Sequence, residues 1–598
     1  MRNKTFQILG LAAIAAVGLT ACDGLGKMVK KSNTVQYTVT PNPIEMHGDT
    51  VAVTIAGKYP PKYFAKKVAL TITPVIKYSG GEKALKPVNV IGEKAVGSGT
   101  KVAYTNGGSF SYSDRVAYEK GMEKATVEVK VTGQVKSKKK EFPAMKVADG
   151  TIVTPLLVKS DEKSIMGKDA FTKTKPVSAN SVIYYVVNQS NVRPTEMNSA
   201  DMKAFKEFVE KGYEKGYELK GANISAYASP DGEQSLNSNL ANERAASAAK
   251  AIMNQLKETR KAAMAKQAKA NAKAGTKAEA VTTEPAEQKE EFYSKVGKGE
   301  DWEGFKTLMD QSDIKDKDLI LRVLTMYSDL DQREKEIKNL AKTYAEVSDK
   351  ILPKLRRSMI TLNGEEKSRT DEQITKLSTS TPDSLSVEEL LYAGATLTKD
   401  MNTRLSIYKA AERMYPSDWR AINNAGCIYL MQNKVSDAEA QFEKAAKVDA
   451  KNTTVKNNQG IIARWKGDRK KAAALYKEAA GAGAEVNYNM GIVDIMNGNY
   501  ASAVANFGSY STFDVALAKV LNGSPDAAVQ IIDASDDKDS ALGYYLKAIV
   551  GARTGKADMA TNNLKTAIGK DASYKDKAKD DAEFLKLKDD ANFKALVQ

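Results

Sequence analysis

The feature that most constrains the fold of this 598-residue chain is a repeated pattern of small and aromatic residues near the C-terminus, whose first two rounds lie 34 residues apart. Gly426 and Gly460 are separated by this interval, and each is followed by an alanine, an aromatic residue and a second alanine. These sets are Ala438, Phe442 and Ala445, then Ala472, Tyr476 and Ala479. Small residues let helices approach closely, and the aromatic rings fill the core between them. The pattern therefore predicts stacked helix pairs.

Two further rounds of the same pattern begin at Gly491 and at Ala548, and each round has a turn between its helices. The turns are Asn433-Lys434, Gly467-Asp468, Gly498-Asn499 and Gly555-Lys556. The four rounds resemble tetratricopeptide repeats, an all-α superhelix, which we assign to residues 385–575 with a cap over 576–598. Weaker units are expected at 386–416 and 513–536. The resemblance implies a concave surface that holds a protein partner, which the sequence does not identify.

Composition excludes several kinds of functional site. The chain has 2 Cys and 1 His, which rules out a disulfide scaffold, a Cys/His zinc site and a histidine-dependent catalytic triad unless His47 alone serves. His47 lies in a turn-like segment and is expected to be a solvated loop residue, and Cys427 a small buried one. We expect no catalytic residue, no metal and no cofactor. The net charge of +16 favours an anionic partner.

Residues 1–21 have the basic start and short apolar run of a secretory signal peptide. The run Leu19-Thr20-Ala21-Cys22 resembles the bacterial lipobox, which implies cleavage before Cys22 and acylation of that cysteine. We therefore expect a lipid-anchored outer-membrane protein, with residues 22–32 as a tether. The residues after Cys22 lack an acidic export signal, which favours the periplasmic face. Nucleic acid is excluded as a partner because the chain leaves the cytoplasm.

Residues 33–175 are expected to form an all-β sandwich. Alternating apolar and polar residues mark strands at 34–39, 50–55 and 125–131, and Pro, Gly and Asn mark the turns between them. The stretch YPPKYFAKKVALTITPVIKY resembles an N-terminal β-domain of Bacteroidetes OmpA-like proteins. This resemblance implies no function for the domain.

A different pattern predicts a two-layer α/β domain over residues 178–364. A strand at 181–188 precedes an amphipathic helix capped by Asn198-Ser199, and a strand at 223–228 precedes a helix at 238–256. Residues 257–290 are rich in Ala and Lys, which is typical of a solvated helical or disordered insertion. The last strand is expected at 355–362, and a linker follows over 365–384.

The run ISAYASPDGEQSLNSNLANERAASAAKAI resembles the core motif of the OmpA-like peptidoglycan-binding domain. The matching positions are Tyr227, Gly232, Asn237, Leu240, Arg244 and Ala245. In that family a loop Asp and the helix Arg hold the diaminopimelate of the stem peptide, which carries both an ammonium and a carboxylate. A carboxylate and a guanidinium at a fixed separation recognise both groups. The resemblance implies this role for Arg244.

The sequence departs from the family motif in the loop, where Ser229 stands in place of the ligand-binding Asp. Asp231 follows two residues later. Either Asp231 supplies the carboxylate or the site is degenerate. The expected peptidoglycan site therefore comprises Arg244, Asp231, Ser229 and Asn237.

Three functions are compatible with these segments. The first is a non-catalytic outer-membrane lipoprotein that binds peptidoglycan and scaffolds a protein partner. The second is an accessory subunit of an outer-membrane secretion or assembly machine, a combination that resembles such subunits in Bacteroidetes. The third is a cell-wall hydrolase. Asp301 and Glu303 are the candidate pair of catalytic carboxylates for hydrolysis. Side chains two residues apart on a helix point in different directions, so this spacing argues against a shared catalytic cleft.

Overall fold

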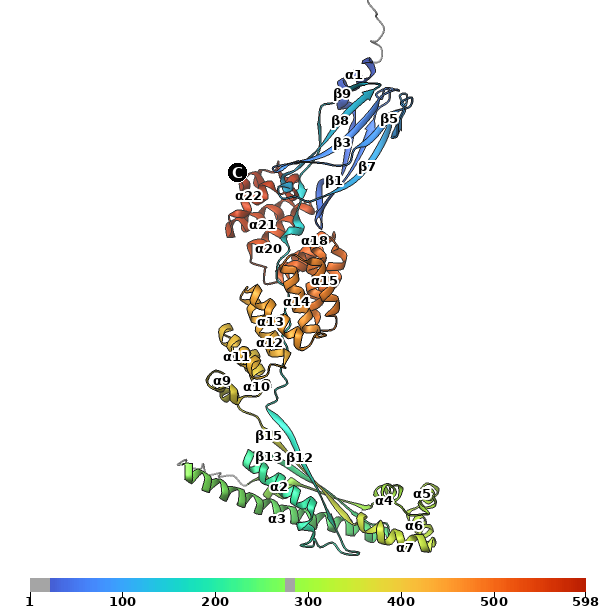
Figure 1. Ribbon diagram of the computed structural model, residues 1–598, viewed down its shortest axis with the longest axis vertical. Helices are drawn as coiled ribbons and strands as arrows, with labels where there is room; N and C mark the ends of the chain where they lie inside the picture. The colour runs from blue at the N-terminus through green and yellow to red at the C-terminus, as the bar shows by residue number, and fades with distance from the viewer. Residues whose placement is uncertain (1–21, 275–284) are drawn as a thin grey trace, which may run out of the picture. The chain divides into compact units, whose positions relative to one another are not determined.

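The computed structural model describes residues 22–274 and 285–598, and these divide into two units. Among the described residues, unit 1 takes 22–168 together with 399–598, and unit 2 takes 169–398 (Figure 1). The signal peptide predicted at 1–21 lies outside the described residues, as does the side chain of Cys22, the expected lipid site. No helix in the described ranges has the length and apolar character needed to cross a membrane.

Unit 1 begins with two sheets, which confirm the β-rich N-terminal region. One sheet has the strand order β11-β1-β2-β7, and the other has the order β10-β8-β3-β5-β6 with β4 beside β3 and β9 beside β8. The strands are β1 (Gln36–His47), β2 (Thr50–Tyr59), β3 (Ala69–Tyr78), β4 (Gly81–Ala84), β5 (Val88–Gly92), β6 (Thr100–Val102), β7 (Gly108–Ala117), β8 (Thr126–Val135), β9 (Lys138–Glu141), β10 (Met145–Asp149) and β11 (Thr151–Ile152). Apolar residues alternate with polar or smaller ones along β2, so one face of this strand is buried. Val51, Val53 and Ile55 lie on that face and point into the core.

Residues 22–32 form part of this β-domain and not a free tether. Helix α1 (Cys22–Lys30) places Leu25 and Met28 on one face, three residues apart, and both are buried in the core between the sheets. The hydroxyl of Tyr63 donates to the carbonyl of Met28 over 3.1 Å. The burial of these two side chains attaches the start of the described chain to the sheets.

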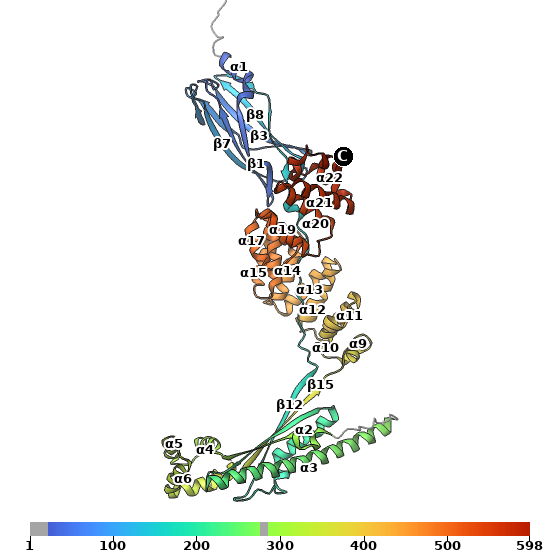
Figure 2. The same ribbon diagram turned by 180° about the vertical axis from the view of Figure 1, so that it is seen from behind.

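The sandwich ends at Ile152, earlier than the predicted boundary at residue 175. Residues 153–168 leave the sheets and run along the helices of the repeat region, which belongs to the same unit (Figure 2). The segment can leave the sheets because side chains of the helices accept hydrogen bonds from its main-chain N–H groups.

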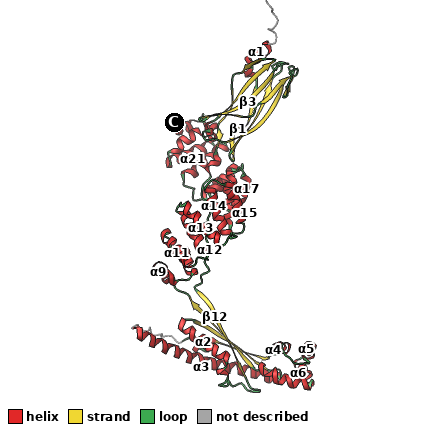
Figure 3. Ribbon diagram, viewed as in Figure 1, coloured by secondary structure: helices red, strands yellow, loops and turns green. Residues whose placement is uncertain are grey.

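The C-terminal region is helical, as predicted, and its helices form successive pairs (Figure 3). The pairs are α12 (Trp419–Met431) with α13 (Val435–Val448), α14 (Thr453–Trp465) with α15 (Arg469–Glu478), α16 (Ala484–Met496) with α17 (Tyr500–Phe507), α18 (Phe513–Leu521) with α19 (Pro525–Asp533), and α20 (Ala541–Arg553) with α21 (Ala557–Lys570). Helix α11 (Met401–Met414) precedes them, and α22 (Ser573–Asp580) and α23 (Ala591–Val597) follow. The predicted turn residues Asn433, Gly467, Gly498 and Gly555 all have the positive φ that ends a helix.

The repeated glycine makes close packing within each pair possible. A Cβ on Gly426 would lie 2.6 Å from the ring of Phe442, and one on Gly460 would lie 2.4 Å from the ring of Tyr476. Gly491 and Phe507 repeat this arrangement at 2.8 Å. Each aromatic ring thus occupies the space that a larger residue on the first helix would need.

The β1–β2 hairpin of the sandwich contacts the repeats. Asp49 at its tip accepts from Nη1 of Arg469 over 2.8 Å, and a Cβ on Gly48 would lie 3.0 Å from the carbonyl oxygen of Asn497. His47 lies at the end of β1 with a half-exposed side chain, and its ring centre is 5.5 Å from that of Tyr500. These contacts lie within unit 1.

Unit 2 contains a four-stranded sheet with the order β12-β15-β13-β14. Its elements are β12 (Thr174–Tyr184), α2 (Ala200–Lys215), β13 (Glu218–Ala228), α3 (Gln234–Ala274), β14 (Tyr293–Glu300) and β15 (Arg357–Lys367). Strands β13 and β14 are parallel, and β15 is antiparallel to both β12 and β13. Apolar residues of α2 and α3 pack on the sheet in one core. The predicted cap Ser199 accepts from the amide of Met202 over 3.2 Å.

Helix α3 extends past the predicted end at residue 256 and continues through residue 274, so the first part of the Ala/Lys-rich insertion is helical, one of the two forms expected for it, while residues 275–284 lie outside the described part. Between β14 and β15, a small helical cluster has its own core. Its helices are α4 (Trp302–Asp310), α5 (Lys317–Met326), α6 (Leu330–Asn339), α7 (Ala341–Lys350) and α8 (Leu352–Leu355). The expected linker at 365–384 instead contains the end of β15 and helix α9 (Asp371–Ser380), before α10 (Val387–Tyr392).

The close packing at Gly460 gives a first prediction. We expect Gly460→Ala to destabilise unit 1 by about 1–3 kcal/mol, because the added methyl group forces the ring of Tyr476 to move. Gly569→Ala is the matched control, since nothing lies within 4 Å of its Cβ on α21, and it should stabilise by about 0.5–1 kcal/mol through helix propensity. Scanning calorimetry measures both changes. Equal shifts for the two variants would contradict the packing argument.

Candidate functional site

The loop between β13 and α3 contains the predicted residues Ser229 and Asp231. Ser229 is buried, and its hydroxyl donates to the carboxylate of Asp231. Nη1 of Arg356 lies 3.8 Å from Oδ2 of Asp231. Burial raises the pKa of Asp231 above its usual range, while the Ser229 hydroxyl and the charge of Arg356 oppose the rise. The loop therefore places a carboxyl group beside a guanidinium.

Arg244 is fully buried and binds backbone oxygens. Its Nε donates to Gln189 over 3.0 Å, Nη1 to Tyr227 over 2.9 Å and Nη2 to Val186 over 3.2 Å. The guanidinium carbon lies 5.1 Å from the ring centre of Tyr185. Burial lowers the pKa of Arg244 to about 10. Arg244 thus joins the end of β13 to the chain that follows β12.

Asn237 orders the same loop from the first turns of α3. Its Nδ2 donates to Oε1 of Glu300 over 2.8 Å and to the carbonyl of Gly232 over 3.5 Å. The amide of Gly232, at a φ of +134°, donates to Oε1 of Glu334 over 2.6 Å. Glu300 belongs to β14 and Glu334 to α6, so two other elements fix the loop.

Sequence reasoning missed Arg356. Its Nε is buried and has no hydrogen-bond partner in the described part of the chain. Arg356 immediately precedes β15, which pairs antiparallel with β13 and aligns Ser358 with Ala226. The start of β15 therefore lies beside the end of β13 and its loop. A signal was present in the sequence, because two consecutive arginines, Arg356 and Arg357, stand at the start of the predicted last strand.

Asp301 has a structural role in unit 2. Its Oδ1 accepts from the amide of Gly304 over 2.9 Å and caps α4, and its Oδ2 lies 2.8 Å from Nη2 of Arg357. The carboxylate considered for hydrolysis is thus engaged by a helix terminus and an arginine.

A second candidate site lies along the first helices of the repeat pairs in unit 1. Residues 159–168 are held there by Asn424 of α12, Asn458 of α14 and Asn489 of α16, which we call the asparagine ladder. Each amide group binds both main-chain groups of one residue: Asn489 binds Lys163, Asn458 binds Ile165 and Asn424 binds Gly167. The N–H to Oδ1 distances are 2.7, 2.9 and 2.7 Å, and the Nδ2 to carbonyl distances are 2.9, 2.8 and 2.9 Å.

The ladder binds the main chain of every second residue, because alternate residues of an extended chain face the same side. Asn457 and Asn423 add bonds to the carbonyls of Lys163 and Ile165, at 3.1 and 3.0 Å. Cys427 lies 3.5 Å from the carbonyl of Ile165 and is fully buried, and burial raises its thiol pKa to about 12. The cysteine is buried, as predicted, and it also contacts the bound segment.

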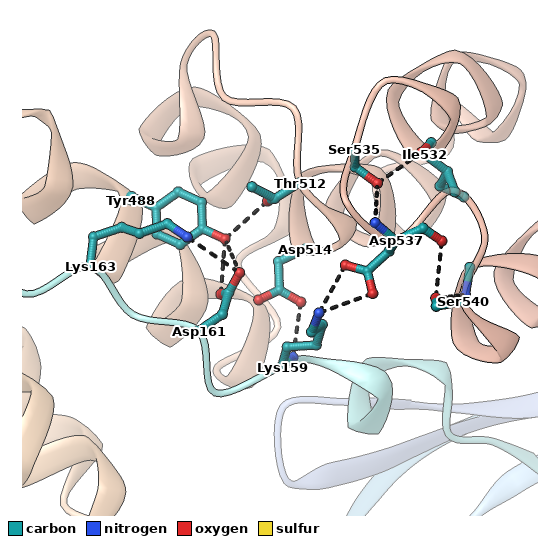
Figure 4. A network of polar contacts seen from close by, with 11 residues as sticks. Lys159, Asp161, Lys163, Tyr488, Thr512, Asp514, Ile532, Ser535, Asp537 and Ser540 are labelled. Atoms are coloured by element: carbon teal, nitrogen blue, oxygen red, sulfur yellow. Dashed lines mark hydrogen bonds and ion pairs between the residues drawn. The ribbon is translucent and has the colours of Figure 1, made fainter. Parts of the chain in front are cut away.

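Side chains of the segment bind the repeats as well. Glu162 accepts from Nη2 of Arg464 over 2.6 Å and from the indole of Trp465 over 2.8 Å. Figure 4 shows the neighbouring network, in which the carboxylate of Asp161 accepts from the hydroxyl of Tyr488 at 2.8 and 2.9 Å. The ammonium of Lys159 lies 2.8 Å from Oδ2 of Asp537.

Asp514 of α18 stands where the other helices have a ladder asparagine. Its Oδ1 accepts from the amide of Lys159 over 2.9 Å, while its buried Oδ2 has no hydrogen-bond partner among the described residues. Burial raises the pKa of Asp514 well above its usual range, and the negative charge of Asp161 raises it further.

No protein-family model matches this chain, and no curated protein does. Solved structures that resemble it include PilW, described as a widely conserved type IV pilus biogenesis factor, with 14% identity, a TM-score of 0.27 and coverage of 38% of this chain and 99% of PilW. A tetratricopeptide repeat protein from Parabacteroides merdae has 12% identity, a TM-score of 0.25 and coverage of 46% and 98%. YrrB, described as a TPR protein with an unusual peptide-binding site, has 17% identity, a TM-score of 0.20 and coverage of 34% and 94%.

Asp514 gives a prediction about pH. Because its pKa is raised in the folded state, the stability associated with its proton is present in acid and is lost as pH rises through the folded pKa. Asp514→Asn keeps an acceptor for Lys159 and removes the charge, so we expect it to stabilise unit 1 by about 1–3 kcal/mol at pH 8 and by much less at pH 4.

Thermal unfolding midpoints of wild type and variant between pH 4 and pH 8 test this expectation. Asp526→Asn is the control, because that carboxylate is 71% exposed and pairs with Lys556 on the surface. A difference between Asp514→Asn and wild type that stays constant over the pH range would contradict the account.

Proposed function

We propose that this protein is a non-catalytic outer-membrane lipoprotein that binds peptidoglycan through unit 2 and holds a protein partner through its repeats. The membrane anchor rests on the lipobox-like run ending at Cys22. The peptidoglycan role is supported by the OmpA-like motif at 224–252 and by the sheet order, with α2 and α3 packed on a mixed sheet.

The observation that carries the peptidoglycan proposal is the pair formed by Asp231 and Arg356. Their charged groups lie 3.8 Å apart in one loop region, and Nε of Arg356 is buried without a partner among the described residues. A diaminopimelate end group carries an ammonium for the carboxylate and a carboxylate for the guanidinium. Arg244 then acts as a positioning residue, since it ties Tyr227 at the end of β13 to the chain after β12.

The scaffold role is supported by the asparagine ladder. Tetratricopeptide repeats present a surface along their first helices, and here that surface already binds an extended segment through its main chain. Main-chain recognition of an extended chain is a general mode of peptide binding. The repeats thus have the chemistry needed to hold a protein segment.

Co-sedimentation with purified diaminopimelate-containing sacculi tests the peptidoglycan role. We expect wild type to sediment with sacculi and both Asp231→Asn and Arg356→Gln to bind about tenfold or more weakly, because each loses one charge-assisted hydrogen bond to the ligand. Arg322→Gln is the matched control, since Arg322 is an exposed arginine of α5 in the same unit, and it should bind as wild type does.

Sacculi with lysine in place of diaminopimelate provide a second control, because they lack the distal carboxylate. Binding should drop for wild type and should not fall further in Arg356→Gln. Equal binding of wild type to both kinds of sacculi would contradict the assignment of Arg356. Release of soluble muropeptides by the wild-type protein would contradict the non-catalytic role.

A further inference from the structure

The segment at 159–168 occupies the asparagine ladder of its own chain. We propose that the ladder is a receptor for an extended peptide with a glutamate in the register of Glu162. Residues 159–168 fill it in cis, and a partner peptide binds by displacing them. This inference rests on the proposed scaffold role of the repeats and is independent of the peptidoglycan site.

The main-chain contacts admit many sequences. Asn489, Asn458 and Asn424 bind only the N–H and C=O groups of alternate residues, and those groups are the same in every non-proline residue. The ladder therefore fixes the direction and register of an extended chain. It leaves the choice of sequence to the side chains on either side of it.

The requirement for an acid comes from Arg464. The side chain of this arginine is 8% exposed and that of Glu162 is 0% exposed, so the charged pair is removed from water. The indole of Trp465 donates to the same carboxylate at 2.8 Å. A ligand without an acidic side chain at this position would leave a buried guanidinium unpaired, which strongly opposes binding.

The chain's own segment fits the site poorly at Asp161, the residue that precedes Glu162. Asp161 brings a second carboxylate toward the buried Asp514, so these two acidic groups can hydrogen-bond to each other only when one of them carries a proton (Figure 4). An asparagine at that position would accept from Tyr488 and could donate to Asp514. A displacing peptide therefore combines the glutamate with a neutral donor just before it, such as Asn, Ser or Thr.

The cis segment competes through proximity as well as through its contacts. It is joined to β11 and to unit 2, so its effective concentration at the ladder is in the millimolar range or above. In the intact chain, a separate peptide that makes the same contacts as residues 159–168 should therefore bind the ladder only weakly. Removing the cis contacts should expose a receptive surface.

The test uses fluorescence anisotropy with two labelled peptides, one of residues 157–169 and one with Asp161→Asn. The full-length proteins are wild type, a variant in which residues 159–167 are replaced by a Gly-Ser linker of equal length, and that variant with Asn458→Ala. Glu162→Ala in the intact chain is a milder way to weaken the cis segment, and Glu207→Ala, at an exposed site on α2, is its control. Circular dichroism establishes that each variant folds.

We expect the linker variant to bind the native peptide at least tenfold more tightly than wild type does, and to bind the Asp161→Asn peptide more tightly still. Adding Asn458→Ala should weaken binding at least tenfold. Glu162→Ala should bind measurably, and Glu207→Ala should behave as wild type does. Equal binding to wild type and to the linker variant would overturn cis occupancy and leave the scaffold role standing.

A folded linker variant that binds neither peptide would contradict both the inference and the scaffold role. The ladder's occupant in wild type would differ if residues 159–168 came from a second copy of the chain. Light scattering, which measures the oligomeric state, tests this alternative. A wild-type dimer that becomes a monomer in the linker variant would overturn cis occupancy and assign the segment to the neighbouring copy.

Discussion

Unit 1 depends on paired hydrogen bonds between side-chain amides and an extended main chain. An extended segment buried against helices leaves its N–H and C=O groups without partners, and each unpaired group costs about 1–3 kcal/mol. A carboxamide solves this problem because it donates and accepts at a fixed spacing, and Asn424, Asn458 and Asn489 each use both functions. The segment can therefore leave the sandwich and lie against helices without forming a sheet.

Buried charges reinforce this arrangement at two points along the segment of residues 153–168. Near its start, the hydroxyl of Thr154 donates to Glu583, a 1% exposed carboxylate that Nε of Arg553 also binds at 2.8 Å. Further along, Arg464 binds Glu162. Such pairs tolerate little change, because removing one partner leaves the other charge buried. Together with the contact between Asp49 and Arg469, they join the sandwich to the repeats.

The helical repeats could be predicted because their determinants are local. Gly460 and Tyr476 contact each other across a short turn, so their spacing is visible in the sequence. The bound segment could not be predicted in the same way, because residues 163–167 lie about 260–330 positions before their partners. A signal was nevertheless present. Asn424, Asn458 and Asn489 each precede the packing glycine of their repeat by two residues, and Asp514 precedes Ala516 by the same interval.

In the loop site of unit 2, too, the residues close together in the sequence could be predicted and the distant ones could not. Arg244, Ser229, Asp231 and Asn237 were found because they belong to one contiguous motif. Arg356 and Glu334 were missed because the sheet register and the helical cluster bring them to the loop from more than a hundred residues away. The structure also changes the expected chemistry around Arg244, whose guanidinium binds three backbone carbonyls. A motif identifies which residues matter, and the register decides which atoms remain available to a ligand.

The most direct test of the account is hydrogen–deuterium exchange of the full-length protein at single-residue resolution across residues 158–168. The ladder predicts an alternating pattern, with the amides of Lys163, Ile165 and Gly167 strongly protected. The amides of Ser164 and Met166, which the ladder does not bind, should exchange faster, and Asn458→Ala should release Ile165 most. Uniformly fast exchange across the segment would contradict its binding to the repeats.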